Sequence, residues 1–278
     1  MKTFVLGVGA QKSGTTWLRD YLAKQPNADF GALQEYHIWD IATLPPPNIH
    51  ADRLLAKVRT QIDGGLPAIK DSRALMRLNF IANPESYFDY FTTLLGKPGI
   101  DLTGDITPSY SRLPSEVLRR IFDGFAARAV QVRPIFLMRD PVYRLRSAVR
   151  MRLRKTDMPA SPDAELDMMN ELHLGRLDLA RSNYHDTVMA LDAAFGPKQV
   201  FYAFYEEFFA ESSIQRLRRF LNLDLSPPEL DVRKNASKPI AELSEPDYTR
   251  LASGYGGIHA FCAKRFDVDI SGIWHYRG

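Results

Sequence analysis

A lysine and several hydroxyl side chains follow the first apolar run of the chain. The run spans Phe4–Gly9, and the turn after it contains the letters Lys-Ser-Gly-Thr-Thr. An amphipathic helix is predicted to begin at the end of this turn, because apolar residues recur there at helical spacing. Such a turn directs backbone N–H groups and the positive end of a helix dipole at one point, where an anion binds well. The sequence therefore predicts a phosphate-binding loop. Its candidate residues are Lys12, Ser13, Gly14, Thr15 and Thr16.

Two common phosphate-binding motifs do not match this loop. A Walker A loop has a glycine directly before its lysine, where this chain has Gln11. A dinucleotide-binding fingerprint has its third glycine at the position of Lys12. An ordinary strand-to-helix turn with a capping hydroxyl is less favoured, because several phosphate-binding features coincide here. The segment from Lys12 to Leu18 instead closely resembles the 5′-phosphate loop of sulfotransferases that use 3′-phosphoadenosine 5′-phosphosulfate (PAPS).

An arginine and a serine later in the chain form a second candidate phosphate site. The clearest buried strand, Pro134–Met138, ends in Arg-Asp-Pro, and Ser147 lies eight residues beyond Arg139. An arginine at a strand end offers a planar fork of donors that suits phosphate. Helical projection turns Ser147 away from the apolar stripe of its helix, so its hydroxyl is predicted to reach a ligand. This pattern closely resembles the 3′-phosphate motif of sulfotransferases.

A glutamate lies near the same predicted sheet edge. Residues Asp29–Leu33 are predicted to form a short strand, and Glu35 follows it. Ligands of open α/β sheets bind at the carboxyl ends of the strands, so Glu35 is expected to face Lys12. The segment Glu35–Asp40 resembles one of the heparan sulfate 3-O-sulfotransferase branch. The resemblance makes Glu35 the base that deprotonates an acceptor hydroxyl and gives His37 a supporting part in substrate binding. The structural alternative is a solvated or capping carboxylate.

A second segment resembles the same branch but departs from it at one position. The predicted strand from Ile100 to Asp105 is followed by Ile-Thr-Pro-Ser-Tyr. This segment resembles a Glu-Lys-Thr/Ser-Pro-x-Tyr stretch, with Asp105 for the glutamate and Ile106 for the lysine. The resemblance places Asp105 at the substrate. Ile106 removes a cation near the reacting groups, so a heparan-type acceptor does not follow from the resemblance.

Two aromatic residues and one basic loop are candidates for contacting the nucleotide. Tyr205 follows the predicted strand Gln199–Phe204 and resembles the tyrosine that contacts adenine in sulfotransferases. Trp17 matches a tryptophan that stacks on the same base, as an aromatic plane can on a purine. Both side chains have core packing as an alternative. The loop 232–238 occupies the place where family members fold a segment over the nucleotide, although their Lys-Gly-Arg or Arg-Lys-Gly signatures are missing. Its candidates are Arg233 and Lys234.

Two other regions are less specific. Residues 41–82 are expected to be an excursion that binds the acceptor, because inserted segments at a ligand edge often determine specificity. Lys70 is its candidate for an anionic acceptor. The helix after Arg139 carries many cations, which indicate either a polyanion-binding surface or a solvated helix with snorkelling arginines. These cations are Arg144, Arg146, Arg150, Arg152, Arg154 and Lys155.

The elements that must position these residues follow from composition and pattern. The chain has 278 residues, of which 45% are hydrophobic, which is enough for a large core in one α/β domain spanning 1–278. Apolar runs alternate with helical patterns, which predicts a mostly parallel central sheet flanked by helices. The residues Lys12, Glu35, Asp105, Arg139 and Tyr205 would then all follow strands at one edge.

Charge and cysteine content limit the function classes. A formal net charge of +3 suits an anionic ligand but is too small for a typical nucleic-acid-binding face. The single cysteine, Cys262, allows neither an intramolecular disulfide nor a cysteine-based zinc cluster, which favours a reducing compartment. No signal-like N-terminus or apolar run of membrane-spanning length occurs in the sequence. We therefore expect a cytoplasmic protein without a membrane span.

Taken together, the resemblance implies a PAPS-dependent sulfotransferase that modifies a hydroxyl, or an amine, of a carbohydrate or small-molecule acceptor and needs no metal. Two alternatives stay open. One is a P-loop-type kinase or nucleotidase in which Asp140 holds magnesium. The other is a non-catalytic nucleotide-binding relative. The sequence leaves the acceptor and the oligomeric state open.

Overall fold

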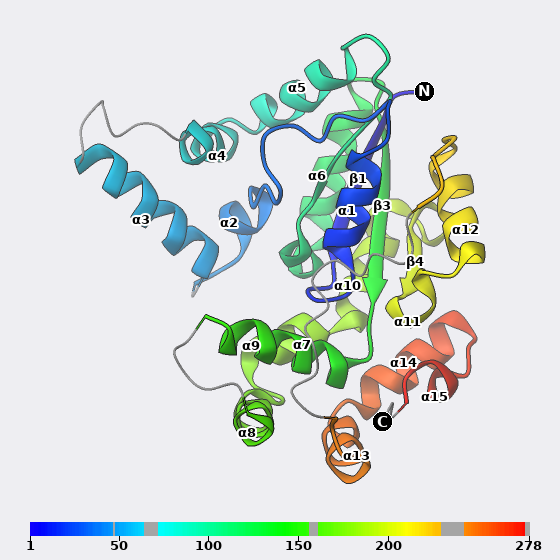
Figure 1. The fold of residues 1–278 in the computed structure, drawn as a ribbon. Helices are drawn as coiled ribbons and strands as arrows, with labels where there is room; N and C mark the ends of the chain where they lie inside the picture. Colours follow the sequence, from blue (N-terminus) through cyan, green and yellow to red (C-terminus); the bar gives the residue numbers. More distant parts are fainter. Residues whose placement is uncertain (47, 64–71, 156–160, 229–241, 276–278) are drawn as a thin grey trace.

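A four-stranded parallel sheet forms the centre of the computed structural model (Figure 1). Its strands lie in the order β2-β1-β3-β4, and every neighbouring pair is parallel. Their bounds are β1 Thr3–Gly9, β2 Leu102–Ile106, β3 Gln131–Met138 and β4 Phe201–Phe204. The structure describes residues 1–46, 48–63, 72–155, 161–228 and 242–275. The predicted single α/β domain with a mostly parallel sheet is confirmed.

Both faces of the sheet are covered by helices, which is why β1 is buried along its whole length. Alternate residues of a strand point to opposite faces. Phe4, Leu6 and Val8 pack in one cluster, whereas Val5 packs in another with Leu18. Figure 1 shows α1 in front of β1 and α6 behind it.

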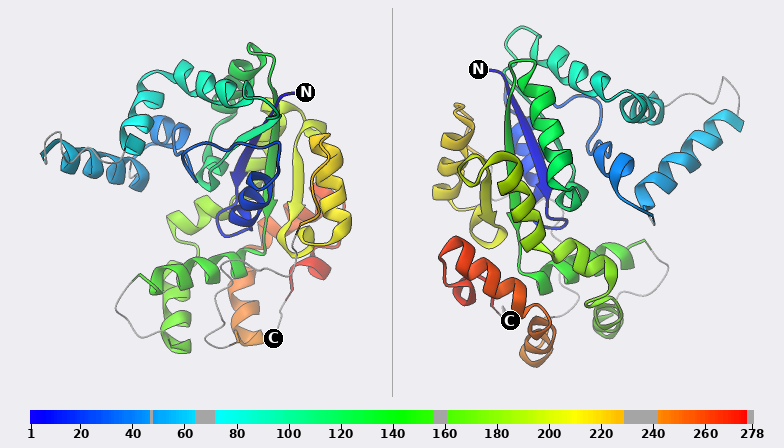
Figure 2. Two further views of the ribbon diagram at one scale, coloured as in Figure 1. Left: turned by 45° about the horizontal axis from the view of Figure 1, so that its top comes forward. Right: turned by 180° about the vertical axis from the view of Figure 1, so that it is seen from behind.

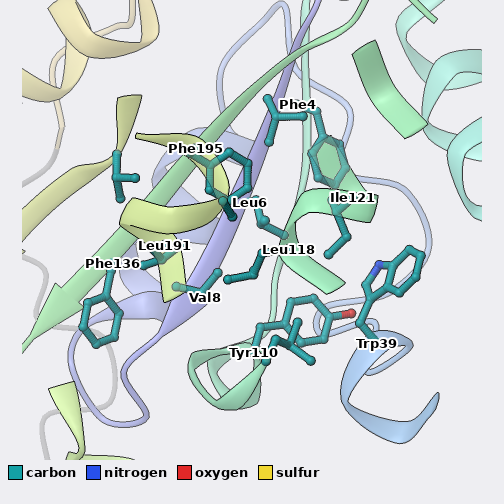
Figure 3. Packing of buried hydrophobic residues seen from close by; sticks show 14 of the residues in the cluster. Phe4, Leu6, Val8, Trp39, Tyr110, Leu118, Ile121, Phe136, Leu191 and Phe195 are labelled. Atoms are coloured by element: carbon teal, nitrogen blue, oxygen red, sulfur yellow. The ribbon is translucent and has the colours of Figure 1, made fainter. Parts of the chain in front are cut away.

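The helices of each face come from separate parts of the chain. One face carries α1 (Thr15–Ala23) and α12 (Glu211–Leu221), and the other carries α5 (Pro84–Leu95), α6 (Ser115–Ala126) and α10 (Tyr184–Phe195). Figure 3 shows Leu118 and Ile121 of α6, with Leu191 of α10, close to the side chains of β1. These contacts fix the strand whose carboxyl end begins the phosphate-loop candidate.

The remaining elements lie at the periphery of this core (Figure 2). Residues 39–82 contain α2 (Trp39–Thr43), α3 (Ile49–Asp63) and α4 (Ser72–Ala82). The segment between β2 and α6 contains the 3₁₀ helix η2 (Pro108–Arg112). Between β3 and β4 are α7 (Pro141–Leu153), α8 (Pro162–Leu172), α9 (Arg176–Ser182) and the 3₁₀ helix η3 (Pro197–Gln199). The C-terminal part has α11 (Tyr205–Phe208), α13 (Glu245–Ser253), α14 (Gly256–Phe266) and α15 (Ile270–Ile273).

The strand predicted at Asp29–Leu33 is absent, and this prediction was wrong. Only Ala28 forms an isolated bridge, to Leu102. Two backbone N–H groups of the stretch donate to side chains instead: that of Gly31 to Asp29 Oδ1 at 2.9 Å, and that of Ala32 to the Tyr90 hydroxyl at 2.9 Å. Because these donors are turned toward side chains, the stretch does not extend the ladder. Glu35 therefore reaches the sheet edge from a loop.

Within the described ranges, none of the helices has both the length and the apolar character required to cross a lipid bilayer.

Candidate active site

A pocket of about 1340 Å³ opens at the carboxyl edge of the sheet. It exceeds the ~300–1,000 Å³ typical of a site for one small ligand, so it has room for two reactants. The residues that line it and that the sequence singled out are Lys12, Gly14, Thr15, Thr16, Trp17, Glu35, His37, Arg139, Ser147 and Tyr205. The structure therefore brings most of the predicted site together in one cavity.

The loop after β1 has the geometry expected of an anion cradle. Lys12 and Gly14 both have left-handed backbone conformations, with φ of 70° and 86°. A Cβ atom on Gly14 would lie 3.2 Å from the Tyr205 ring, so this position is both conformationally and sterically suited to glycine. Helix α1 begins at the next residue. The predicted residue Ser13 is fully buried behind the loop and is not part of the pocket lining, and its hydroxyl has no hydrogen-bond partner within the described ranges.

Lys12 lies in a partly desolvated, cationic environment. Burial lowers its pKa, and the nearby charges of Arg154 and Arg139 lower it further, although Glu35 opposes them. Its Nζ lies 3.9 Å from Met151 Sδ. An anion bound at this point would offset the repulsion among these cations. The position therefore suits a phosphate or sulfate group.

Arg139 connects the end of β3 to the phosphate-loop candidate. Its Nη1 donates a hydrogen bond to the Lys12 carbonyl oxygen at 2.9 Å, and its Cζ lies 4.3 Å from the centre of the Tyr205 ring. Its buried Nε has no hydrogen-bond partner in the described part of the chain. The guanidinium is thus positioned by two neighbours while part of its fork stays available. Ser147, half-buried on α7, lies in the wall of the same pocket.

Asp140 has a structural part next to this arginine. Its carboxylate caps α7 by accepting from the Val142 N–H at 2.8 Å, and it accepts from the Tyr248 hydroxyl at 2.8 Å. The side chain is almost fully buried and is not part of the pocket lining. A magnesium ligand in the pocket would have to be exposed there, so the geometry disfavours the kinase-like alternative for Asp140.

Glu35, His37 and Asp40 form a continuous hydrogen-bonded chain in the pocket wall. His37 Nε2 lies 3.0 Å from Glu35 Oε2, and His37 Nδ1 lies 2.8 Å from Asp40 Oδ2. Burial alone would lower the pKa of His37, but the hydrogen bonds to Asp40 and Glu35 raise it to about 9. At neutral pH the ring is therefore an imidazolium that donates to both carboxylates. The Ser109 hydroxyl donates to the same Asp40 oxygen at 2.5 Å.

The backbone that carries this chain is held by groups that the sequence analysis did not identify. Arg77 donates from Nε to the Tyr36 carbonyl and from Nη2 to the Glu35 carbonyl, each at 2.8 Å. The Tyr36 N–H donates to Thr107 Oγ1 at 3.0 Å. Arg77 lies on α4, more than forty residues beyond Glu35 in the sequence. No local pattern identifies such a contact.

His50, also missed, stacks on the His37 ring with a centroid distance of 3.8 Å. Burial, together with the charge of His37, lowers the pKa of His50 to about 4. Ligand atoms of His37, Asp40 and His50 lie within 4.8 Å of one another, as a metal site would require. Metal binding needs neutral imidazole, however, and His37 already uses both ring nitrogens. We therefore assign His37 and Asp40 to hydrogen bonding.

The structure contradicts the predicted contact between Asp105 and a substrate. Asp105 is fully buried and accepts hydrogen bonds from three hydroxyls: Thr107 at 2.6 Å, Tyr110 at 2.8 Å and Tyr87 at 2.9 Å. Burial raises its pKa to about 6, although these hydroxyls oppose the shift. The Tyr110 hydroxyl in turn accepts from the Ile38 N–H at 3.1 Å. Asp105 thus stabilises, through Tyr110, the loop that contains His37.

Helix α7 is neither a continuous polyanion-binding surface nor a helix with all its arginines in solvent, the two interpretations that its sequence left open. Arg144 is buried and paired with Asp178, and Arg146 and Arg150 both pair with Glu165. The pocket wall nevertheless includes several cations of this helix and of the residues that follow it. They are Arg146, Arg150, Arg154 and Lys155. The helix therefore contributes both internal ion pairs and positive charge in the pocket.

Aromatic rings form the wall next to α1 and α11. Trp17 stacks on Tyr21 at a centroid distance of 5.1 Å and meets Phe209 edge-on. Trp17, Tyr205 and Phe209 all line the pocket. The two predicted aromatic residues are therefore partly packed and partly exposed to the cavity. The other predicted contacts, Lys70, Arg233 and Lys234, lie outside the described residues.

Comparisons with known proteins agree with this geometry. A family model described as "Sulfotransferase family" matches residues 5–227. Among solved structures, a sulfotransferase from Alicyclobacillus acidocaldarius is 21% identical, with 98% of each chain covered and a TM-score of 0.61. A sulfotransferase domain from the curacin biosynthetic pathway is 15% identical, with 97% of this chain and 99% of that chain covered and a TM-score of 0.50. These two similarities support the fold. No curated protein sequence matches the chain.

The protonated state of His37 predicts a specific pH dependence of stability. The folded-state pKa of about 9 lies above the unfolded value, so the charged ring stabilises the fold fully below pH ~6.5 and loses this effect as pH rises toward 9. The difference in unfolding free energy between wild type and His37→Gln should therefore shrink between pH 7 and 9.5. Urea unfolding measures it, with the exposed His185→Gln as control. A constant difference would contradict the imidazolium assignment.

Removing the buried carboxylate of Asp105 should destabilise the fold. Asp105→Ala leaves three buried hydroxyls without their acceptor, and each unsatisfied group costs ~1–3 kcal/mol. We expect the free energy of unfolding to fall by at least about 2 kcal/mol in urea titrations. The matched control is Asp89→Ala, which removes an exposed ion pair with Arg128 and should cost no more than ~1 kcal/mol. Equal effects of the two substitutions would contradict the role of Asp105.

Proposed function

The chain belongs to the sulfotransferase family, and on that premise we propose that it transfers a sulfuryl group from PAPS to a hydroxyl, or an amine, of an acceptor. The observation that carries the proposal is the contact between the two predicted phosphate sites. Arg139, at the end of β3, donates directly to the carbonyl oxygen of Lys12 after β1. Two motifs separated by more than 120 residues thus meet at one point of the pocket. A nucleotide with phosphate groups at both its 5′ and its 3′ position needs two neighbouring phosphate sites in one pocket.

The donor would lie along the edge formed by β1, β3 and α11. The Lys12–Thr16 loop would bind the 5′-phosphosulfate with its backbone N–H groups and the Lys12 ammonium. Arg139 and Ser147 would bind the 3′-phosphate, and Trp17 and Tyr205 would contact the adenine. An available donor supports this fit, because Arg139 Nε is buried without a partner among the described residues. Arg233 and Lys234 stay candidates for closing over the nucleotide.

Glu35 would act as the base in an in-line displacement. It takes the proton of the acceptor hydroxyl as the oxygen attacks sulfur. The new O–S bond forms while the bond from sulfur to the phosphate oxygen breaks, which releases adenosine 3′,5′-bisphosphate. Lys12 stabilises the charge that grows on the leaving oxygen, where a preorganised cation affects the barrier most. This scheme routes no step through a metal.

His37 would position Glu35 during this reaction. Its imidazolium donates to Glu35 Oε2, which fixes the orientation of the carboxylate. Glu35 is 42% exposed at its side chain, so it can approach an acceptor in the pocket. Asp40, hydrogen-bonded to the other ring nitrogen, keeps His37 protonated.

Residues 41–82 would bind the acceptor. Several residues of this stretch line the pocket on the side of Glu35: Leu44, Asn48, Ile49, His50, Asp52 and Arg53. We extend the proposed sulfotransferase domain over 1–278, with 41–82 as its acceptor-binding excursion. The acceptor would be a small molecule or a carbohydrate.

Replacing the proposed base tests catalysis against a purely binding function. Glu35→Gln should lower sulfuryl transfer from labelled PAPS by ~100-fold or more, the usual contribution of a general base. Its affinity for adenosine 3′,5′-bisphosphate should stay within about twofold, because Glu35 does not contact the donor. Glu207→Gln, an exposed glutamate on α11, serves as the matched control. Unchanged transfer by Glu35→Gln across an acceptor panel would favour the non-catalytic alternative.

Nucleotide preference tests the donor assignment. The protein should bind adenosine 3′,5′-bisphosphate more tightly than ATP, with the same affinity in magnesium and in EDTA. Arg139→Gln should weaken that binding about 10- to 100-fold, the range for one lost charge-assisted hydrogen bond. Arg133→Gln, on the same strand but away from the pocket lining, should have little effect. Magnesium-dependent binding that prefers ATP would instead support the kinase-like alternative.

A further inference from the structure

Three arginines of the pocket wall differ from the ion-paired arginines of α7. Arg112 ends η2, and Arg176 and Arg181 lie on α9. All three line the pocket. Within the described ranges none of their guanidinium groups makes a hydrogen bond or an ion pair. By contrast, Arg144 on the neighbouring helix is neutralised by Asp178.

The local geometry places Arg112 on the same side as the Glu35–His37–Asp40 chain. In a 3₁₀ helix the side chains at i and i+3 eclipse each other. Arg112 is three residues beyond Ser109 in η2. The Ser109 hydroxyl donates to Asp40 and lies 3.2 Å from His37 Nδ1. Arg112 therefore projects toward the acceptor side of the pocket.

Helix α9 packs on η2 and adds Arg181 to the same wall. Residues 176, 177, 180 and 181 of this helix line the pocket, and this spacing places them on one helical face. Burial lowers the pKa of Arg181 to about 10, and the charges of Arg144 and Arg112 add to the effect, although the Asp178 carboxylate opposes it. Arg181 is thus a charged group at neutral pH that is held beside other cations. An anion between Arg112 and Arg181 would offset this repulsion.

These arginines lie away from the wall assigned to the adenine. In Figure 1, α2 and α9 lie on the left of the strand ends, whereas α11, which begins with Tyr205, lies on the right. The phosphate groups of the donor already have the Lys12 loop, Arg139 and Ser147. The positive charge on α9 and η2 is therefore available to bind the second reactant.

We propose that Arg112 and Arg181 form an anion-binding subsite for the acceptor, which carries a phosphate, sulfate or carboxylate group in addition to its reactive hydroxyl. This inference rests on the proposed function, because that function identifies the second reactant as an acceptor. The planar forks of two arginines suit the oxygens of such a group. Leu177, between Arg176 and Arg181 in the pocket lining, provides apolar contact for the body of the molecule.

A matched pair of small probes tests the subsite without knowledge of the natural acceptor. With the donor site saturated by adenosine 3′,5′-bisphosphate, phenyl phosphate and phenol are titrated by ligand-observed NMR. Wild type should bind phenyl phosphate at least ~10-fold more tightly than phenol, as expected for a charge-assisted hydrogen bond. Arg112→Gln/Arg181→Gln should remove this difference. Phenyl sulfate and benzoate, titrated in parallel, rank the three anionic groups.

Two further double variants control for net charge and for folding. Arg119→Gln/Arg219→Gln removes two exposed arginines that do not line the pocket, and it should keep the wild-type preference. Arg112→Lys/Arg181→Lys retains both charges without the forks and should give an intermediate preference. The proposal is overturned if wild type binds both probes equally or binds neither. It is equally overturned if the preference survives in Arg112→Gln/Arg181→Gln.

The same experiments separate this inference from the proposed function. Failure of wild type to bind adenosine 3′,5′-bisphosphate contradicts the donor assignment but leaves the subsite testable. The probe titrations are then repeated in a Lys12→Met/Arg139→Gln background, which removes the anion contacts of the donor edge. A phenyl phosphate preference that persists there and requires Arg112 and Arg181 supports the subsite alone. Loss of the preference in that background would assign the anion to the donor edge and overturn the subsite.

Discussion

The site depends on the contact between the ends of β1 and β3, where Arg139 donates a hydrogen bond to the Lys12 carbonyl oxygen. All four strands run in one direction, so their carboxyl ends meet at one edge. Backbone N–H groups at the start of α1 point toward this edge, as they must when a helix follows a parallel strand. The hydrogen bond, 2.9 Å long, holds the Arg139 guanidinium against the backbone of the phosphate-loop candidate. This acceptor and the Tyr205 ring together keep the arginine beside the loop.

The acidic half of the site is built from a different kind of constraint. Glu35 comes from a loop without strand structure, so the sheet does not position it directly. A buried layer does so instead: the Asp105 carboxylate orients Tyr110 and Thr107, whose side chains accept from the backbone N–H groups of Ile38 and Tyr36. Burying the Asp105 carboxylate in this layer is unfavourable and raises its pKa. The buried carboxylate nevertheless keeps Tyr110 and Thr107 in place, and these two side chains hold the backbone around His37.

Local patterns predicted the parts of the fold that depend on local sequence. The apolar stripe of Val142, Leu145, Val149 and Leu153 is buried as a single cluster, so the helical period also placed Ser147 in the pocket wall. Periodicity identifies a face but not the partner of a charge. The ion pairs of the α7 arginines with Asp178 and Glu165 join separate helices, and no spacing rule reveals them. The burial of Asp105 could not be predicted either, because the sequence does not distinguish the last residue of a strand from the first residue of a loop. The strand predicted at 29–33 does not form, because two backbone N–H groups of this stretch donate to the side chains of Asp29 and Tyr90 and not to a neighbouring strand.

Under the proposed function and the proposed acceptor subsite, the pocket holds two anionic reactants, and the distribution of counter-charges is consistent with this. Carboxylates behind the wall pair with Arg144, Arg146 and Arg150, of which the last two share Glu165, while Glu35 and Asp40 share the single charge of His37. The cations left facing the cavity therefore include Lys12 on the donor side and Arg181 on the acceptor side, each with a pKa lowered by burial and by neighbouring cations. Under the proposed function, each reactant supplies the missing negative charge at its own end of the pocket. The charge of Glu35 interacts with that of Lys12, so under the proposed function the binding of the donor anion reduces the positive field that opposes proton transfer to the Glu35 carboxylate.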